Sequence, residues 1–391
     1  MGIFSRTPKL PEPQVDRIDY PDSPAVYRPT SQVRGVITFQ SPVQRQIKSA
    51  HVSFYGHCQT ACTRSESTGS GNNSRSNTVY YEDDVDLFRQ SHPLAEAFTS
   101  EPGQQSTWDY NFAFPRYSKN ERGEVYRKDT ACSPVYQVSP HELPPSFSFF
   151  TSTSTHAHVE YVLEAAIFFE DSEKPYIVKF APLEYSPLPP EMPPDYQPSF
   201  AEYVKPPEKY ASSRLTGGEK SFRNSFRDKF SSATPSMTVT MKASIVPFLS
   251  TATAFPLYIC IELDNLSDPH AINIPSVNIR MKSLKIGQGT TWRAIRTHGT
   301  IHPEHEEFMD SSISMNAVPD SRVVEVQLGP EKKQLVFPTS FEARIPSNVC
   351  ASFRTVTINH AHRLKAVVEV EVAGKIFEHK FAVDNLEIMP V

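Results

Sequence analysis

Cysteine and glycine are both scarce in this chain of 391 residues, which holds five cysteines and 14 glycines. An odd and sparse set of cysteines does not form the disulfide framework of a small secreted domain. The sequence also lacks a run of ~20 apolar residues that would cross a bilayer, and its first residues lack the apolar run of a signal peptide. We therefore expect the protein to be cytoplasmic.

A surplus of positive charge is absent as well, because 39 Lys and Arg stand against 44 Asp and Glu, for a formal net charge of −5. This balance excludes the global basic field that nucleic-acid binding uses, so no nucleic-acid partner is predicted. No nucleophile turn of the Gly-x-Ser-x-Gly type occurs. Gly287-Gln288-Gly289 lacks the further glycines of a nucleotide-binding loop. We predict a protein without catalytic residues or cofactors.

The patterns that would bind a metal are incomplete. Two pairs of histidines each share a strand face, namely His156 with His158 and His360 with His362. Cys58 and Cys62 stand four residues apart, but no second pair of cysteines accompanies them. None of these sets supplies the four ligands of a structural zinc site. We predict histidines that are solvated or hydrogen-bonded, and no metal.

Proline is abundant by contrast, with 35 residues, and it predicts short elements and many turns because it disrupts helices and central strands. Between the turns, apolar residues alternate with polar ones, which is the period of a half-buried strand. Residues 33–39 place Val33, Ile37 and Phe39 on one face, and residues 108–114 place four aromatic side chains on one face. Short alternating strands of this kind favour antiparallel sandwiches.

A second series of strand candidates begins near Met237. Within it, residues 367–377 predict a hairpin that turns at Ala373 and Gly374. Residues 64–78, which are rich in Ser, Gly and Asn, predict a loop. The predicted fold is therefore all-β, with two tandem immunoglobulin-like antiparallel β-sandwich domains. Its parts are an N-terminal sandwich over residues 1–181, a long linker over 182–235 that is first proline-rich and then basic, and a C-terminal sandwich over 236–391.

A set of short segments shares both its residues and its order with a known family. Leu143-Pro144-Pro145-Ser146-Phe147 is similar to an element of fungal and animal alpha-arrestins. The other segments that carry the resemblance are Tyr27–Phe39, Ile47–Gly56, Trp108–Pro115, His158–Leu163, Arg344–Ser347 and His362–Val370. Together they are distributed over most of the length of the chain. The sequence therefore resembles arrestin-like proteins, and most closely the alpha-arrestins (arrestin domain-containing proteins) of fungi.

The resemblance implies a non-catalytic adaptor. An arrestin-like platform is expected to hold the cytoplasmic segments of membrane proteins at sheet edges and in the groove between its domains. It would bring this cargo to a ubiquitin ligase and so promote endocytosis and protein transport. Fold alone does not fix function. The alternatives are a trafficking or signalling scaffold of the same fold without ligase recruitment, and a β-sandwich enzyme that acts on lipid or carbohydrate.

Pro193, Pro194 and Tyr196 form a Pro-Pro-x-Tyr sequence, the motif that WW domains bind. The prolines favour the extended polyproline II conformation, which fits an aromatic groove, and the tyrosine fills a second pocket. In an arrestin-like protein this motif is expected to recruit a WW-domain ubiquitin ligase of the HECT type. The alternative is a solvated proline-rich linker without a partner.

A basic segment follows in the same predicted linker. Three phenylalanines recur at the spacing of one helix face, with three cations among them: Phe222, Arg223, Phe226, Arg227, Lys229 and Phe230. Such a helix would rest on an anionic membrane, where each cation near the surface contributes about 1 kcal/mol. This interpretation predicts peripheral contact with the plasma or endosomal membrane. The alternative is that the phenylalanines pack on the protein's own sandwich.

Overall fold

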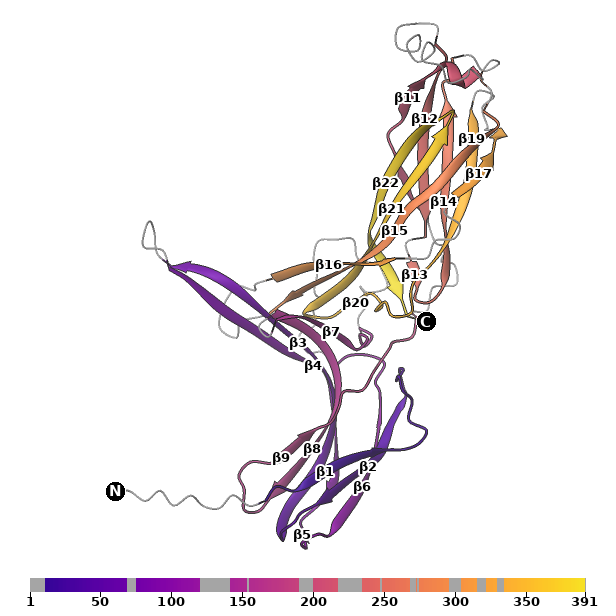
Figure 1. Cartoon of the computed structure of the whole chain (residues 1–391). Coiled ribbons are helices and arrows are strands. Elements are labelled where there is room, and N and C mark those ends of the chain that lie inside the picture. Colours follow the sequence, from indigo (N-terminus) through magenta and orange to yellow (C-terminus); the bar gives the residue numbers. More distant parts are fainter. Residues whose placement is uncertain are drawn as a thin grey trace. The chain divides into compact units, whose positions relative to one another are not determined.

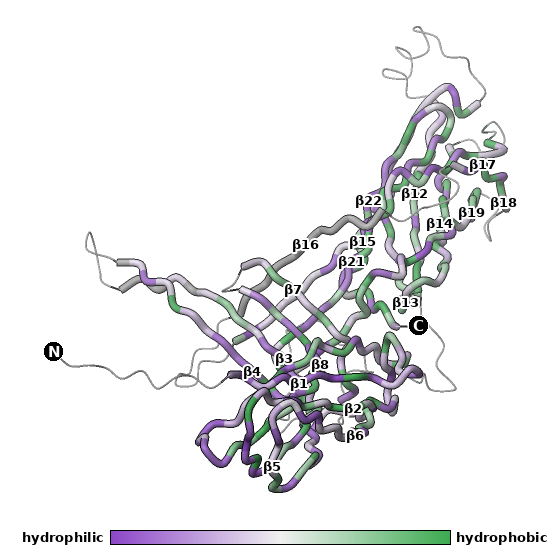
Figure 2. Tube along the Cα trace, turned by 60° about the horizontal axis from the view of Figure 1, so that its bottom comes forward, coloured by the Kyte–Doolittle hydropathy of each residue, from purple (hydrophilic) through white to green (hydrophobic). Residues whose placement is uncertain are grey.

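The fold is all-β, as predicted, and most of its strand pairs are antiparallel (Figure 1). The structure is a computed structural model, and the residues that it describes are 11–68, 75–119, 141–152, 155–189, 200–216, 234–246, 248–267, 272, 274–294, 304–314, 321–328 and 334–390. Hydrophobic and hydrophilic residues alternate along many strands (Figure 2). Within the described ranges, no helix is long and apolar enough to span a bilayer.

The chain forms two compact units, and neither is a single continuous segment. Unit 1 contains Met1–Leu188, Thr291–Glu306 and Phe353–Asn359. Unit 2 contains Pro189–Thr290, Glu307–Ser352 and His360–Val391. The boundary at Leu188 lies close to the predicted end of the N-terminal sandwich at residue 181. The two later segments of unit 1, in contrast, come from the range that we predicted to form only the C-terminal sandwich.

Unit 1 contains two sheets, with strand orders β1-β2-β6 and β4-β3-β8-β7. In addition, β5 pairs with β3, and β9 pairs with β8. The bounds are β1 (Gln14–Asp19), β2 (Gln32–Gln40), β3 (Arg45–Thr68), β4 (Arg75–Ala95), β5 (Phe98–Ser100), β6 (Gln105–Ala113), β7 (Phe147–Ser152), β8 (Thr155–Phe169) and β9 (Tyr176–Lys179). Phe54 of β3 contacts Phe112 of β6, with 5.7 Å between ring centroids. Phe39 of β2 contacts Phe169 of β8 at 6.4 Å, so the core lies between the two sheets.

A close approach between strands β1, β2 and β6 requires glycine at position 35. A Cβ atom on Gly35 would lie 2.3 Å from the carbonyl oxygen of Ile18 and 2.7 Å from the hydroxyl oxygen of Tyr110. This hydroxyl donates a hydrogen bond to Oδ1 of Asp19 at 2.9 Å. Because the space for a side chain is occupied, any larger residue at position 35 would displace this part of the sandwich.

Unit 2 also places its core between two sheets. The orders are β10-β12-β14-β19-β18, with β11 on β12, and β13-β22-β21-β15-β16, with β17 on β15 and β20 on β21. Of the second sheet, β20 and the parts of β15, β16 and β21 that fall within residues 291–306 and 353–359 belong to unit 1. The bounds are β10 (Ala201–Val204), β11 (Glu208–Ala211), β12 (Ser236–Ile245), β13 (Phe248–Ser250), β14 (Ala254–Asp264), β15 (Ser276–Arg293), β16 (Glu304–Ser314), β17 (Ser321–Glu325), β18 (Gln327–Leu328), β19 (Leu335–Arg344), β20 (Phe353–Arg354), β21 (Ile358–Val372) and β22 (Lys375–Met389). Met241 and Ile259 of the first sheet belong to the same buried cluster as Val370 and Phe377 of the second.

The predicted hairpin in this unit is confirmed. Val372 at the end of β21 pairs with Lys375 at the start of β22, which leaves a two-residue turn. Ala373 and Gly374 both have positive φ angles, of 47° and 76°. Two positive φ angles in a two-residue loop are typical of the type I′ turn, whose twist matches that of the flanking strands.

The structure differs from the predicted linker over residues 182–235. Strands β10 and β11 and a short 3-10 helix, η3 (Ser213–Thr216), lie in this range. Tyr203 of β10 stacks on Phe381 at 5.8 Å, and Tyr210 of β11 meets Phe377 edge-on at 5.6 Å. These aromatic side chains attach the two short strands to the core of unit 2. Residues 190–199 and 217–233 of the predicted linker lie outside the described residues.

The predicted loop over residues 64–78 is also wrong for most of its length. Strands β3 and β4 continue as a long antiparallel hairpin (Figure 1), in which Arg64 pairs with Val79 and Thr68 with Arg75. Main-chain hydrogen bonding between two strands depends little on side-chain polarity, so a Ser- and Asn-rich composition does not prevent it. Residues 69–74 lie outside the described residues.

The core of unit 1 is completed by residues from the second half of the chain. Trp292 is fully buried, and its indole N–H donates a hydrogen bond to the carbonyl oxygen of Ala61 at 2.9 Å. Its ring lies 5.3 Å from that of Phe149. The backbone N–H of Arg293 donates to the carbonyl oxygen of Thr357 at 2.9 Å. Residues 291–294 and 353–359 thus form part of one packed structure with β3 and β7.

Candidate functional site

All predicted site residues fall outside the described residues. This applies to the WW-binding residues Pro193, Pro194 and Tyr196, and to the membrane-binding residues Phe222, Arg223, Phe226, Arg227, Lys229 and Phe230. Both sets stay predictions. The structure does describe the chain close to the Pro-Pro-x-Tyr motif on either side, up to Pro189 and again from Phe200.

Upstream of the motif, the chain is fixed to unit 1. Tyr185 is 1 % exposed and stacks on Phe114, with 4.8 Å between ring centroids. Nη1 of Arg28 donates hydrogen bonds to Oγ of Ser186 at 3.2 Å and to the carbonyl oxygen of Pro187 at 3.0 Å. Hydrogen bonds from a charged donor are stronger than neutral ones. Stacking and these hydrogen bonds therefore hold the chain up to the boundary between the units.

Downstream of the motif, the chain enters unit 2 as strand β10. Its backbone pairs with β12 from Ala201 to Val204. Tyr203 points to the core, whereas Phe200 and Val204 are about half exposed. The motif therefore lies in a short stretch of sequence that is held by packed structure at both of its ends.

A cluster of charged side chains lies on the solvent-facing side of the sheet that contains β4, β3 and β8. His57 of β3 contacts Oδ1 of Asp84 through Nδ1 at 2.9 Å. Its Nε2 lies 3.8 Å from Oε2 of Glu160 on β8. The register of the strands brings these three side chains together. His57 pairs directly with Glu160 of β8 on one side and with Asp86 of β4 on the other, and Asp84 lies two residues before Asp86 on β4.

The two carboxylates determine the charge of this histidine. Hydrogen bonds to Asp84 and Glu160 raise the pKa of His57 to about 9, against the opposing effect of burial. The same contacts lower the pKa of both carboxyl groups. At neutral pH the cluster is therefore a paired imidazolium between two carboxylates. The cluster therefore presents two acidic side chains and one cation that are already paired with one another.

Further paired charges continue this face. The guanidinium of Arg89 lies 4.1 Å from the centre of the Tyr55 ring and 3.1 Å from Oδ2 of Asp86. The hydroxyl of Tyr55 donates a hydrogen bond to Oε2 of Glu164 at 3.3 Å, and Nζ of Lys179 lies 3.9 Å from the same oxygen. The sequence did not single out this face, because its residues come from four separated strands. The one available sign in the sequence was that each of these residues occupies a solvent-facing position in the alternation of its strand.

Replacement of Asp84 with asparagine is expected to lower the pKa of His57 from about 9 toward its ordinary value of 6.5. The reason is that the closer of its two acceptors loses its charge. The pKa is raised in the folded state, so its contribution to stability is present below pH 6.5 and is lost as pH rises through 9. NMR titration of the His57 ring would measure the change. Glu160→Gln should have a smaller effect because its contact is longer, and a larger one would contradict this description.

Comparison with known proteins gives no family for the chain. No protein-family model matches it, and no curated protein matches it. The assignment to arrestin-like proteins is therefore a proposal, supported by the segments of sequence described above and by the all-β fold.

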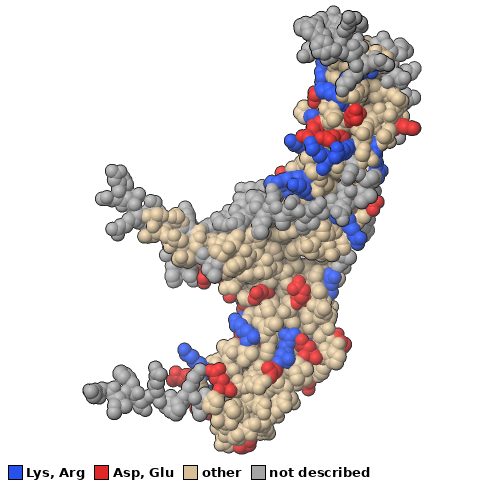
Figure 3. All heavy atoms as spheres, viewed as in Figure 1, with Lys and Arg blue, Asp and Glu red and all other residues tan. Residues whose placement is uncertain are grey.

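Unit 2 carries a ladder of ion pairs across the outer side of strands β15, β21 and β22. Nζ of Lys282 lies 2.7 Å from Oε1 of Glu369 and 2.9 Å from Oε2 of Glu378. Lys380 contacts the same Glu378 at 3.0 Å. Lysine and arginine side chains gather with acidic ones on these strands (Figure 3). Such exposed pairs contribute little to stability, and they leave both signs of charge available to a partner.

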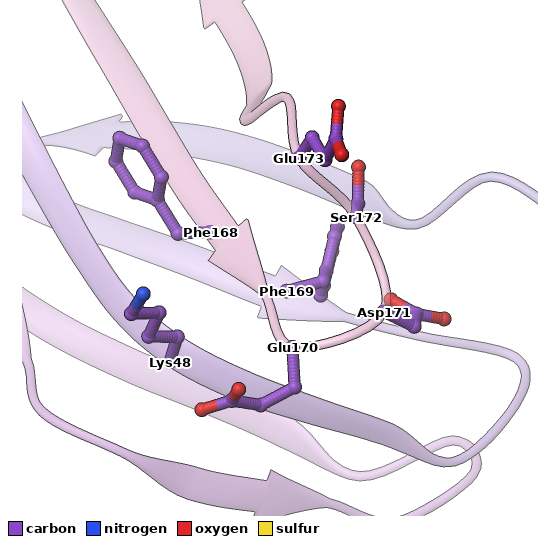
Figure 4. A pocket seen from close by; sticks show the side chains of 7 residues that line it. All are labelled: Lys48, Phe168, Phe169, Glu170, Asp171, Ser172 and Glu173. Carbon is purple, nitrogen blue, oxygen red and sulfur yellow. The ribbon is translucent and has the colours of Figure 1, made fainter.

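A shallow pocket lies at the turn between β8 and β9 (Figure 4). Lys48 and residues 168–173 line it, including three acidic side chains at Glu170, Asp171 and Glu173. Oγ of Ser172 donates to the carbonyl oxygen of Lys174 at 2.8 Å and so holds the turn. This hydroxyl serves as a turn residue, and no activating base contacts it within the described residues.

The predicted pairing of histidines on strand faces is confirmed. The rings of His156 and His158 lie 4.8 Å apart, and those of His360 and His362 lie 4.9 Å apart. Cys58 is buried, and burial raises the pKa of its thiol to about 12, which makes it a poor nucleophile. Among the described residues, no group of three or more His, Cys, Asp or Glu side chains is placed to hold a metal ion.

One of these histidine pairs is buried in unit 2. Nδ1 of His360 lies 3.0 Å from Oγ1 of Thr290, and Nδ1 of His362 lies 2.9 Å from Oγ of Ser352. The same serine oxygen accepts a hydrogen bond from the backbone N–H of Ile388 at 2.9 Å. Burial lowers the pKa of His360 to about 4 and that of His362 well below its usual range. Both rings are therefore neutral at pH 7.

Proposed function

We propose that this protein is an arrestin-like, non-catalytic adaptor that links membrane-protein cargo to a WW-domain ubiquitin ligase of the HECT type. The cargo would then be ubiquitinated, internalised and sorted. The protein would act in the cytoplasm and at the surface of the plasma or endosomal membrane.

The observation that carries this proposal is the place of the Pro-Pro-x-Tyr motif between two fixed points of the chain. Arg28 and Tyr185 hold the chain before the motif, and β10 holds it afterwards. The motif is therefore an internal segment of the chain that directly precedes the first strand of unit 2. Its proline content favours the extended form that the WW groove accepts.

Two sandwiches suit the other half of the adaptor role, which is cargo binding. Cytoplasmic segments of membrane proteins would be recognised by paired charges such as those around His57 in unit 1 and Lys282 in unit 2. With cargo on one surface and the ligase at the motif, the protein would raise the effective concentration of cargo lysines at the ligase. The ligase supplies the chemistry, and the adaptor supplies proximity.

Replacement of Tyr196 with alanine is expected to weaken binding of the chain to a purified WW domain at least tenfold, because the second pocket loses its side chain. Isothermal titration calorimetry would measure the affinity. A peptide spanning residues 202–214 is a matched control, since Pro206, Pro207 and Tyr210 have one more intervening residue and should not bind. An unchanged affinity in Tyr196→Ala would remove the ligase claim and favour a scaffold without ligase recruitment.

A further inference from the structure

Strands β10 and β11 form a strap, residues 200–211, along the edge of β12 in unit 2. β10 pairs with β12 over four residues and β11 pairs with it over four more; Figure 1 shows β11 beside β12. Pro206 and Pro207 separate the two pairings, and proline has no N–H to donate to a strand ladder. Among the described residues, no strand pairs with the other edge of the strap. Short edge elements of this kind belong to the least stable parts of a fold.

The strap contributes little to the core of the unit. Ala201, Tyr203 and Tyr210 pack against the buried cluster, but each is only partly buried. The first buried apolar side chain after the strap is that of Leu215, in η3. Detachment of the strap would therefore expose only part of three side chains to water, while Leu215 would keep the chain anchored just beyond it.

A clasp of three charged side chains, Glu208, Lys205 and Lys375, joins the strap to β22. Oε1 of Glu208 accepts a hydrogen bond from Nζ of Lys375 at 2.9 Å, and its Oε2 accepts one from Nζ of Lys205 at 3.3 Å. Nζ of Lys375 also lies 5.0 Å from the centre of the Tyr210 ring and 4.4 Å from that of Phe377. One ammonium of β22 thus makes an ion pair and a cation–π contact with the strap.

The clasp is accessible to solvent. Lys375 is 37 % exposed and Glu208 is 42 % exposed, so water and salt weaken their attraction. Lys375, and to a smaller extent Lys205, lower the pKa of Glu208, which keeps this carboxylate charged at neutral pH. Nζ of Lys205 also donates a hydrogen bond to the carbonyl oxygen of Glu378 at 2.8 Å. The strap is therefore held by contacts that a change of charge at position 208 would weaken together.

We propose that the strap is a releasable edge strand, and that an extended peptide with aromatic side chains pairs with β12 in its place when the clasp opens. The strap itself indicates this occupant, because the edge of β12 already accepts an extended segment with one tyrosine in each half. The ring of Tyr203 lies 5.8 Å from that of Phe381, and the ring of Tyr210 lies 5.6 Å from that of Phe377.

An incoming peptide would bind by strand addition. Its main chain would supply the hydrogen bonds to β12, and its aromatic side chains would fill the places that Tyr203 and Tyr210 leave. This device does not involve the Pro-Pro-x-Tyr motif, so the proposed function stands if the strap never opens.

Glu208→Lys in the whole chain is expected to open the strap, because it replaces attraction to Lys205 and Lys375 with repulsion. Amide hydrogen exchange in β10 and β11, followed by mass spectrometry, should become about tenfold faster. Glu325→Lys is the matched control, since it makes the same substitution at an exposed position of β17 in the same unit. Exchange in β10 and β11 should be unchanged in this control.

The second measurement tests strand addition. A fluorescent synthetic peptide with the sequence of residues 200–211 keeps Glu208, so it can pair with Lys375 in the opened variant. Fluorescence anisotropy should show that this peptide binds the Glu208→Lys chain at least tenfold more tightly than the wild type, where the strap occupies β12. The same peptide with Tyr203→Ser and Tyr210→Ser should lose this binding, because the aromatic contacts are absent.

Each outcome decides one part of the proposal. Unchanged exchange in the strap of Glu208→Lys would overturn the clasp. Faster exchange without peptide binding, or equal binding of the serine-substituted peptide, would overturn strand addition by an aromatic peptide. Glu208→Gln removes the ion pairs without repulsion and should cause a smaller increase, confined to the strap. If exchange rises evenly across unit 2 in both variants, the strap does not open as a separate element and the proposal is wrong.

Discussion

Trp292→Ala is expected to lower the free energy of unfolding of unit 1 by about 3–5 kcal/mol, the usual loss for a buried aromatic side chain truncated to alanine. The indole is fully buried, contacts Phe149 at 5.3 Å and donates to the carbonyl oxygen of Ala61 at 2.9 Å. Its removal leaves a cavity beside β3 and β7, and the carbonyl oxygen of Ala61 loses the indole N–H as its hydrogen-bond donor. The effect is unusual in that a residue far along the sequence destabilises the N-terminal sandwich.

Differential scanning calorimetry of the whole chain would measure this loss. The fluorescence of Trp108, on β6, would assign the affected transition to unit 1, because Trp108 and Trp292 are the two tryptophans of the chain. Trp292→Phe is a matched variant that keeps most of the ring volume and loses the N–H donor, so it should cost about 1 kcal/mol. A transition of unit 1 that does not move in Trp292→Ala would show that residues 291–294 do not belong to its core.

Acidification is expected to destabilise unit 2 by about 3 kcal/mol at pH 4 through His360 alone. The pKa of His360 is about 4 in the folded state, against 6.5 in the unfolded chain. Below pH 6.5 the unfolded state therefore binds the proton more readily, so stability is retained above this pH and is lost as pH falls toward 4. Each pKa unit corresponds to about 1.4 kcal/mol. His362, whose pKa is also lowered, increases the loss.

Calorimetry between pH 7.5 and 4 would follow the transition of unit 2. A double variant with His360→Gln and His362→Gln keeps hydrogen-bonding groups near Thr290 and Ser352 but cannot titrate, so its pH slope should be shallower. Val368→Ala is the control, because Val368 is 1 % exposed on the same strand and its truncation should lower stability at every pH without changing the slope. The prediction fails if wild type and double variant have the same slope.

Side-chain alternation and turn residues predicted those parts of the fold that depend only on residues close together in the sequence. The alternation over residues 33–39 corresponds to β2, with Val33, Ile37 and Phe39 buried. The Ala373-Gly374 turn follows from the positive φ angles that this residue pair adopts. In each case the side-chain period or the turn residues carry the information within a few positions of sequence.

Features that depend on strand register or on distant packing could not be predicted in this way. The contact of His57 with Asp84 and Glu160 joins residues from three strands, and their neighbours in sequence give no sign of it. Membership of Trp292 in unit 1 is decided by burial against β3 and β7. The extension of β3 and β4 beyond residue 64 runs against composition, because ladder hydrogen bonds outweigh the weak preference of Ser and Asn for turns.

The divided composition of unit 1 has a consequence for biosynthesis. A ribosome that adds about 5–20 residues per second takes roughly 10–30 seconds to proceed from Leu188 to Asn359, the last residue of this unit. During that interval the nascent sandwich lacks Trp292 and exposes the apolar surface around Phe149 that this side chain later covers. The domain that emerges first therefore cannot complete its core until a segment from the second half of the chain has been synthesised, and its exposed apolar surface could bind chaperones during that interval.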